Sequence, residues 1–143
     1  MIRVMFLCTG NSCRSQMAEG LARILGRGLI DAHSAGLMPT DVNIRAVAVM
    51  QEIGIDISDQ ESKEIDTDFL LSMDVIITLC GNAEASCPIT PPDIKRLHWP
   101  IDDPAAAKGS KEEIMAEFRK ARDEIRQKIS AFSQLYIRRW LIT

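Results

Sequence analysis

The sequence reads Cys8-Thr9-Gly10-Asn11-Ser12-Cys13-Arg14-Ser15 between an apolar run, Val4-Met5-Phe6-Leu7, and a segment whose apolar residues have helical spacing. A strand, a short polar loop and the start of a helix therefore meet at these eight residues. The first amides of a helix have no partners within the helix, and the helix dipole places partial positive charge at that end. We expect an anion-binding loop at this junction.

The residues of this loop suit a nucleophilic thiol inside an oxyanion site. Arg14 offers a planar set of donors that matches a tetrahedral oxyanion, and Gly10 lets the backbone approach a ligand. Cys8 begins the loop, where the helix dipole, Arg14 and the Ser15 hydroxyl favour the thiolate form of a cysteine. The alternative is a buried cysteine at a strand end beside a surface arginine. The oxyanion-binding loop is expected to comprise Thr9, Gly10, Asn11, Ser12, Cys13, Arg14 and Ser15.

The composition is that of a globular protein of one domain. The chain has 143 residues, of which 46% are hydrophobic and 26% are charged, and its net charge is −3. This length suits one domain, and the negative charge argues against a nucleic-acid partner. The sequence has neither the pattern of a secretory signal nor an apolar run of the ~20 residues that span a bilayer. We therefore expect a cytoplasmic protein with no membrane contact.

Strand and helix patterns alternate along the chain. Apolar runs predict strands at residues 2–7, 29–35, 75–79 and 94–98, and helical spacing predicts helices at residues 15–25, 43–53, 66–72 and 110–132. This order predicts an α/β fold, with one central four-stranded parallel sheet flanked by helices and a single domain over residues 1–143. Residues 135–143 form an apolar tail that we expect to pack on its own domain, with a partner-binding role as the alternative.

Ligands of parallel sheets bind beyond the carboxyl ends of the strands. Cys8, Cys80 and Asp103 all follow predicted strands. We therefore expect these three residues to share one crevice although they are far apart in the sequence.

The segment C-T-G-N-S-C-R-S-Q-M-A-E-G, which starts at Cys8, resembles the low-molecular-weight protein tyrosine phosphatase superfamily. Further motifs, S-A-G at 34–36, T-L-C-G at 78–81 and H-W-x-x-D-D-P-A at 98–105, are similar to those of its thioredoxin-coupled arsenate reductases. The resemblance covers residue 2 to about residue 129. It implies the fold of the small tyrosine phosphatases and an enzyme that reduces arsenate.

The four cysteines of the chain fit a redox role better than a structural one, because disulfides are disfavoured in the cytosol. Zinc binding is an alternative, but the gap of six residues between Cys80 and Cys87 is loose for a zinc site, and zinc would consume Cys8. Reducing arsenate to arsenite takes two electrons, which two thiols supply when they form a disulfide. The resemblance implies Cys8 as nucleophile and Cys80 and Cys87 as successive resolving thiols. The disulfides would be Cys8–Cys80 and then Cys80–Cys87, with thioredoxin as the final reductant.

An Asp-Pro pair supplies the general acid throughout the superfamily, and Asp103 before Pro104 matches it. The alternative for Asp103 is a turn residue before a proline. Alanines at 105–107 stand where the tyrosine phosphatases have aromatic residues that line a phosphotyrosine groove, so a small inorganic oxyanion is the expected substrate. A phosphatase acting on a phosphotyrosine protein or a small phosphoester is the alternative function. We expect a monomer without a cofactor or metal.

Several of the resembling reductases bind a potassium ion beside the loop through an Asn, a Glu, a Ser and an Asp. Asn11, Glu19 and Ser34 match the first three positions, but the fourth falls at Lys63. A lysine ammonium can occupy the same electrostatic position. We therefore expect activity that does not depend on potassium.

Overall fold

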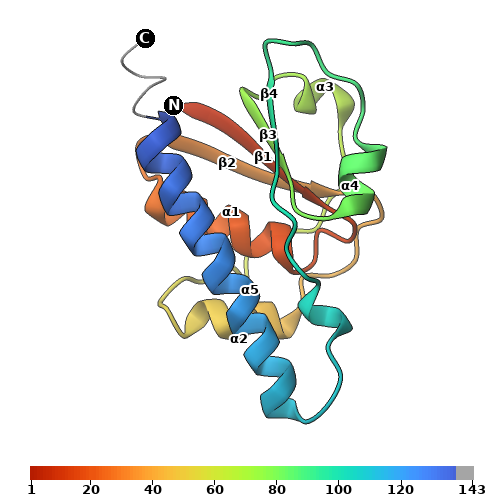
Figure 1. Ribbon diagram of the computed structural model, residues 1–143, viewed down its shortest axis with the longest axis vertical. Coiled ribbons are helices and arrows are strands. Elements are labelled where there is room, and N and C mark those ends of the chain that lie inside the picture. The colour runs from red at the N-terminus through yellow and green to blue at the C-terminus, as the bar shows by residue number, and fades with distance from the viewer. Residues whose placement is uncertain (138–143) are drawn as a thin grey trace.

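Strand β1, Ile2–Cys8, lies inside a parallel sheet of four strands with the order β2-β1-β3-β4 (Figure 1). The computed structural model describes residues 1–137 of the chain. The other strands are β2 Ile30–Gly36, β3 Val75–Thr78 and β4 Lys95–His98. Strand β1 is hydrogen-bonded on both edges, and because helices cover both faces of the sheet, its apolar run is almost entirely buried. The predicted α/β fold with four parallel strands is confirmed.

The helices cover both faces of this sheet (Figure 1). Helices α1 Arg14–Leu25, α2 Ile44–Gln51 and α5 Lys111–Phe132 pack against one another on one side. The short helices α3 Thr67–Leu70 and α4 Gly81–Ser86 lie on the other side. A 3-10 turn, η1 Pro104–Ala106, precedes α5, and a π-helical turn, η2 Ser133–Ile137, follows it. The alternation of strands and helices therefore gives the two outer layers that a parallel sheet requires.

The predicted elements agree with the structure to within two residues at every boundary. Ser110 begins α5 with the capping box expected from the sequence, since its side chain accepts from Glu113 N and the Glu113 side chain accepts from Ser110 N. Helix α4 is an element that the sequence analysis did not predict. The Cys80 side chain caps it by accepting from Ala83 N, and its alanines favour a helix once that cap is in place.

The carboxyl-terminal tail is described only in part. Leu135, in the π-helical turn, is 68% exposed rather than packed. Residues 138–143 lie outside the described part of the chain, so the packing of the tail and the extension of the domain to residue 143 stay predictions.

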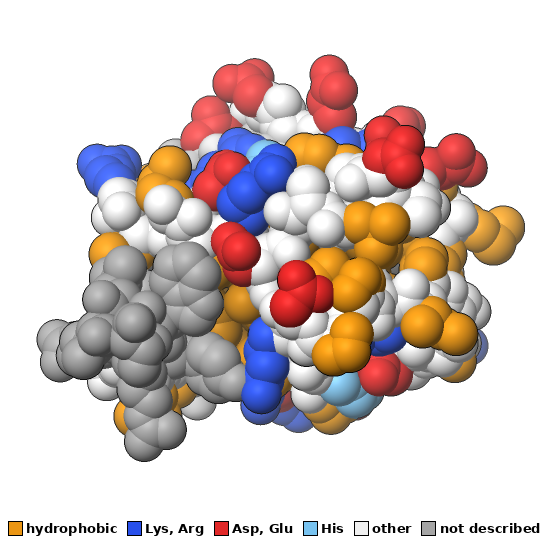
Figure 2. Space-filling model, turned by 90° about the horizontal axis from the view of Figure 1, so that it is seen from above, with side chains coloured by type: hydrophobic (Ala, Val, Ile, Leu, Met, Phe, Trp, Pro, Cys, Tyr) orange, Lys and Arg blue, Asp and Glu red, His pale blue; other side chains and the backbone are white. Residues whose placement is uncertain are grey.

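Two observations concern possible contacts with membranes and nucleic acids. Within residues 1–137, no helix has the length and apolarity that a membrane crossing demands. Seen from above, the molecule carries acidic side chains along one margin and separate basic ones elsewhere (Figure 2). The described residues of this face therefore present no continuous basic surface of the kind used to bind nucleic acids.

Candidate active site

The loop between β1 and α1 places the Cys8 thiol beside a hydroxyl whose hydrogen is available to it. Cys8 Sγ lies 2.8 Å from Ser15 Oγ, and both side chains are buried. Asn11 Nδ2 donates a hydrogen bond to the same Ser15 oxygen, also at 2.8 Å. Since that oxygen accepts from Asn11, its own hydrogen is free to point at the sulfur. This arrangement stabilises negative charge on Cys8, as a nucleophilic thiolate requires.

Asn11 fixes the shape of the loop from behind. It is fully buried and adopts a left-handed backbone conformation with a φ of 46°. Its side-chain oxygen accepts from Lys63 N at 2.9 Å, and its carbonyl accepts from Ser62 Oγ at 2.7 Å and Gln16 Nε2 at 2.9 Å. An unusual backbone conformation persists only where the surroundings determine it in this way. The segment around residue 62 therefore holds the loop ready for its ligand.

Strand β2 closes the loop from the side. Gly36 is the register partner of Cys8, and a Cβ atom added to it would lie 2.7 Å from Asn11 N and 2.8 Å from Thr9 O. Only glycine allows the two backbones to approach this closely. The chain that follows donates to three loop carbonyls, through the amides of Leu37, Met38 and Thr40.

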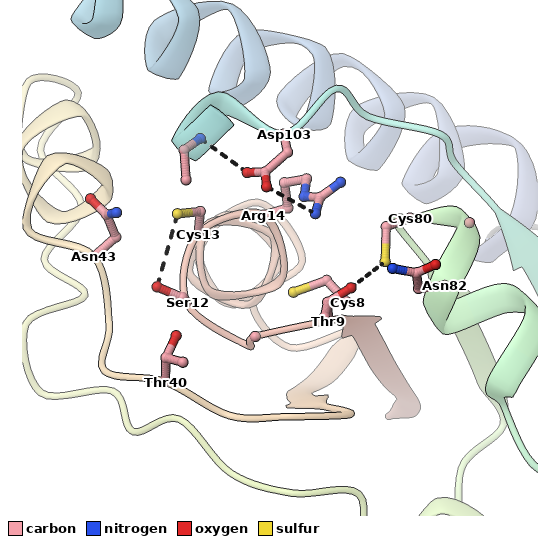
Figure 3. A pocket seen from close by; sticks show the side chains of 13 residues that line it. Cys8, Thr9, Ser12, Cys13, Arg14, Thr40, Asn43, Cys80, Asn82 and Asp103 are labelled. Carbon is pink, nitrogen blue, oxygen red and sulfur yellow. Dashed lines mark hydrogen bonds and ion pairs between the residues drawn. The ribbon is translucent and has the colours of Figure 1, made fainter. Parts of the chain in front are cut away.

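Arg14 and Asp103 lie next to each other at a cavity of about 660 Å³ (Figure 3). Arg14 Nη1 donates to Ile101 O at 2.9 Å, which aims the guanidinium, and Nη2 lies 3.8 Å from Asp103 Oδ2. The other oxygen of Asp103 accepts from Ala105 N at 3.0 Å and caps η1. Asp103 therefore has both the turn role considered as its alternative and a carboxylate oxygen at the cavity.

The two cysteines that follow β3, Cys80 and Cys87, differ from each other in their position relative to the cavity. Cys80 lines the same cavity as Cys8, and its sulfur lies 3.3 Å from Thr9 Oγ1 and 3.4 Å from Ala83 N (Figure 3). Cys87 is half-buried at the other end of α4 and does not line this cavity. Burial raises the pKa of the Cys87 thiol. All four cysteines are free thiols in this structure.

Cys13, the fourth cysteine, lies in the loop itself and lines the cavity. Burial raises the pKa of Cys13 from 9.0 to about 11, although the hydrogen bond between Cys13 and Ser12 opposes the rise. Cys13 is therefore a neutral thiol at physiological pH, and we assign it no chemical step.

The structure thus brings most of the expected site residues to one cavity and leaves one apart. Those that line it are Cys8, Thr9, Gly10, Ser12, Cys13, Arg14, Cys80 and Asp103. Asn11 and Ser15 support the loop from below, and Cys87 lies outside. Gly81 and Ala105 also line the cavity, as do three polar residues that were not expected from the sequence, Thr40, Asn43 and Asn82. Each is a polar side chain in a loop or at a helix end, with no motif to single it out.

Glu19 lies below the loop in contact with two cations. Its carboxylate is 2% exposed and accepts from Ser34 Oγ at 2.8 Å. Lys63 Nζ lies 3.7 Å and Arg23 Nη2 lies 3.1 Å from its two oxygens. Lys63 therefore stands beside this carboxylate, where the resemblance places a potassium ion. In residues 1–137, no group of three or more His, Cys, Asp or Glu side chains is arranged to hold a metal ion, so the zinc alternative has no ligand set there.

Comparison with known proteins agrees with this geometry. A Bacillus subtilis protein named arsenate reductase is 50% identical over 131 residues, which are 92% of this chain and 94% of that protein. A solved structure described as an arsenate reductase in the phosphate binding state has a TM-score of 0.75 and 37% identity, over 92% of this chain and 96% of its own. A thioredoxin-dependent arsenate reductase from Corynebacterium glutamicum has a TM-score of 0.68 and 26% identity, over 92% of this chain and 63% of its own.

The resemblance to arsenate reductases with a small phosphatase fold is therefore confirmed. Residues 3–138 match the family model described as low molecular weight phosphotyrosine protein phosphatase. Because this match spans nearly the whole chain, the chain belongs to the low molecular weight phosphotyrosine protein phosphatase family.

Proposed function

We propose that this enzyme reduces arsenate to arsenite with the thiols of Cys8, Cys80 and Cys87, and that thioredoxin then reduces the resulting disulfide. The observation that carries the proposal is the second thiol in the cavity: Cys80 lines the space into which Cys8 faces. Hydrolysis of a phosphoester needs the loop, Arg14 and a general acid, but it needs no second cysteine. Reduction of arsenate requires one.

The first step is attack of the Cys8 thiolate on arsenic. Loop amides and the Arg14 guanidinium bind the oxyanion, and the Ser15 hydroxyl supports the thiolate until the S–As bond forms. One oxygen leaves arsenic as water, and Asp103 supplies a proton to it. The carboxylate lies 3.8 Å from Arg14, on the rim of the same cavity, which is the side from which a leaving oxygen can be protonated.

The second step transfers two electrons to arsenic. The Cys80 thiolate attacks Cys8 Sγ, the S–As bond breaks, and its electron pair stays on arsenic as arsenite leaves. The products are As(III) and a Cys8–Cys80 disulfide. Thr9 Oγ1 lies 3.3 Å from Cys80 Sγ and can stabilise the attacking thiolate by donating to it.

The third step moves the disulfide away from the nucleophile. Cys87 attacks Cys80, which forms Cys80–Cys87 and releases Cys8 as a thiolate. The Cα atoms of a disulfide lie within ~7 Å of each other, so α4 must unwind to bring the two ends of this segment together. Thioredoxin then reduces Cys80–Cys87 with its own dithiol. The thioredoxin-dependent structural neighbour supports this reductant. We also infer that the enzyme acts in the cytoplasm as a monomer in arsenic detoxification.

The test couples arsenate reduction to NADPH oxidation through thioredoxin and thioredoxin reductase. Wild type is compared with Cys80→Ser and Cys87→Ser, and each variant is also assayed for hydrolysis of an aryl phosphate. We expect both variants to lose catalytic cycling and to keep phosphatase activity, because the loop and Asp103 are unchanged. That retained activity controls for an intact oxyanion site.

One result would favour the phosphatase function instead. If wild type oxidises no NADPH with arsenate, and all three proteins hydrolyse the aryl phosphate equally well, Cys80 and Cys87 have no part in turnover. The shared oxyanion loop would then serve a phosphoester substrate.

A further inference from the structure

Arg96, on β4, contacts both ends of the segment that must move during the proposed reaction. Its Nη2 lies 3.9 Å from Glu84 Oε2 within α4, and its Nη1 donates to Pro88 O at 3.3 Å just beyond Cys87. The positive charge of the guanidinium also acts on the Cys87 thiol, whose pKa it lowers. One side chain therefore joins the middle of α4 to the backbone just beyond the third cysteine of the relay.

Glu84 is held in this position by a second set of contacts. Its Oε2 accepts a short hydrogen bond of 2.6 Å from Thr78 Oγ1. His98 Nδ1 lies 2.8 Å from the same hydroxyl, and since the only hydroxyl hydrogen is donated to Glu84, the imidazole must be the donor to Thr78. The carboxylate of α4 is thus tied to the ends of β3 and β4, and it stays beside Arg96 while α4 is folded.

Two charged side chains face the Cys87 thiol, and they act on it in opposite directions. Burial is the main cause of its raised pKa; the Arg96 guanidinium lowers that pKa, and the Glu84 carboxylate raises it further. While the carboxylate lies beside the guanidinium, much of the positive charge available to Cys87 is neutralised. Unwinding of α4 carries Glu84 away but leaves Arg96 on its strand.

We propose that Arg96 is a further catalytic residue of the thiol relay, which stabilises the Cys87 thiolate once unwinding of α4 has removed Glu84 from it. The inference rests on the proposed function. In this step the Cys87 thiolate attacks Cys80 Sγ, the Cys80–Cys87 bond forms, and the Cys8–Cys80 bond breaks. The electron pair of the broken bond leaves on Cys8 as a thiolate, so the exchange has no net oxidation or reduction.

This arrangement orders the two thiol exchanges. Cys87 stays largely protonated while α4 is folded and Cys8 is free to bind its oxyanion. Formation of Cys8–Cys80 displaces Cys80 from the cap of α4, which loosens the helix that holds Glu84. Cys87 is then activated only when there is a disulfide for it to attack.

The first experiment measures the thiol itself and needs no arsenate. Reduced full-length protein is labelled briefly with iodoacetamide over a range of pH, and labelling at Cys87 is read by peptide mass spectrometry. We expect Glu84→Gln to speed labelling at pH 7.5 about threefold, the change in thiolate fraction that half a pKa unit gives, and Arg96→Met to slow it by a similar factor. Arg96→Lys should fall between Arg96→Met and wild type.

The second experiment follows one turnover with arsenate and no thioredoxin. Quenched samples are analysed for which two cysteines are joined. Wild type should end as Cys80–Cys87, whereas Arg96→Met should form Cys8–Cys80 at the normal rate and convert it about tenfold more slowly, because the exchange rate follows the thiolate fraction. Arg126→Met, on the exposed surface of α5, makes the same chemical change elsewhere and should behave as wild type.

The outcomes separate the inference from the function on which it rests. Equal conversion rates in wild type and Arg96→Met would overturn the role of Arg96 and leave the relay intact. Labelling changes of the same sign in Glu84→Gln and Arg96→Met would also overturn it, since a general loosening of α4 moves both the same way. If wild type forms no disulfide with arsenate, the proposed function fails and the inference fails with it, whatever the labelling shows.

Discussion

Two segments meet at the cavity, and they are built in opposite ways. The loop from Cys8 to Ser15 has buried side chains behind it and backbone neighbours on two sides, and a methyl group added at Gly36 would meet that backbone at 2.7 Å. The segment from Cys80 to Cys87 is a six-residue helix with mostly exposed residues, and a methyl group added at Gly81 would meet nothing within 4 Å. The first is fixed by its surroundings, while the second is held by a few side-chain contacts.

This difference matches the chemistry proposed for each segment. An oxyanion site stabilises a transition state only when its donors already point at the right place, because reorganising them during the reaction costs free energy. A thiol relay instead requires one sulfur to reach two partners in turn, and segments with few buried contacts open at low free-energy cost. The proposed relay therefore combines a rigid site with a neighbouring segment that has few buried contacts.

The largest effect is expected from Gly36→Ala, which tests the rigidity of the loop. The new Cβ would lie 2.7 Å from Asn11 N and 2.8 Å from Thr9 O, so the loop backbone must shift. Displacing donors in a preorganised site by about 1 Å can cost about 100-fold, and we expect at least this loss in kcat/KM for both arsenate and an aryl phosphate. Overpacking should also lower the free energy of unfolding by ~1–3 kcal/mol.

Steady-state assays and denaturant unfolding of Gly36→Ala measure both effects. A variant that is destabilised but fully active would show that the loop tolerates movement, and the contrast between the two segments would then be wrong.

The next effect concerns stability at high pH and compares the two cysteines that have raised pKa values. Burial raises the pKa of Cys13 from 9.0 to about 11. Because the folded-state pKa lies above the unfolded one, its contribution to stability is complete below pH 9 and is lost as the pH rises toward 11. We expect a loss of about 2 kcal/mol over this range in wild type that Cys13→Ala does not show. Cys87 is only half-buried, so its titration should cause a smaller loss of stability at high pH.

Urea unfolding at several pH values between 8 and 11 gives this difference directly. Parallel curves for wild type and Cys13→Ala would mean that Cys13 is not shielded from water in the folded protein.

The two segments also differ in how much of their structure could be predicted from the sequence alone. The order of Cys8, Arg14 and Ser15 after an apolar run predicts the loop, because local chain geometry makes the anion site. Apolar runs predict the four strands, and the proline that follows Asp103 identifies it as a candidate general acid. These features are encoded by neighbours in the sequence.

What the sequence left open depends on distant partners. Helix α4 depends on the Cys80 cap and on the contact of Glu84 with Thr78, and only the fold reveals the latter. The positioning of Asn11 by Lys63 likewise joins segments far apart in the chain, and Arg96 on β4 reaches back over a loop to Pro88, just beyond Cys87. No spacing rule within one segment predicts such contacts.

A smaller effect is expected from Gly81→Ala, which stabilises the segment that must unwind. Alanine favours a helix over glycine by ~0.5–1 kcal/mol, and the site has room for the methyl group. Unwinding α4 then costs that much more, so disulfide formation after arsenate addition should slow by about two- to fivefold. Hydrolysis of an aryl phosphate should change by less, since it needs no movement of Cys80.

Rapid-quench analysis of a single turnover measures this rate. Faster disulfide formation in Gly81→Ala would mean that Cys80 attacks from a folded α4. The proposal that the segment from Cys80 to Cys87 unwinds during the reaction would then be wrong.

The smallest effect is expected from exchanging KCl for NaCl at equal ionic strength, which tests how the loop is supported from below. The buried Glu19 carboxylate lies 3.7 Å from Lys63 Nζ and 3.1 Å from Arg23 Nη2, so a potassium ion would approach a carboxylate that already has two cations. We expect no change in kcat/KM for arsenate. A clear rise with KCl would show that the ammonium does not take the place of an ion.

Lys63→Met sharpens this test because it removes the ammonium and keeps the backbone amide that donates to Asn11. Glu19 then retains its contacts with Arg23 and the Ser34 hydroxyl, and a space opens beside an incompletely neutralised buried carboxylate. Activity of this variant should fall in NaCl and recover in part in KCl, whereas the same salts leave wild type unchanged. If neither salt distinguishes the variant from wild type, the charge below the loop does not matter to catalysis, and the rigidity of the loop rests on Asn11 and its backbone partners alone.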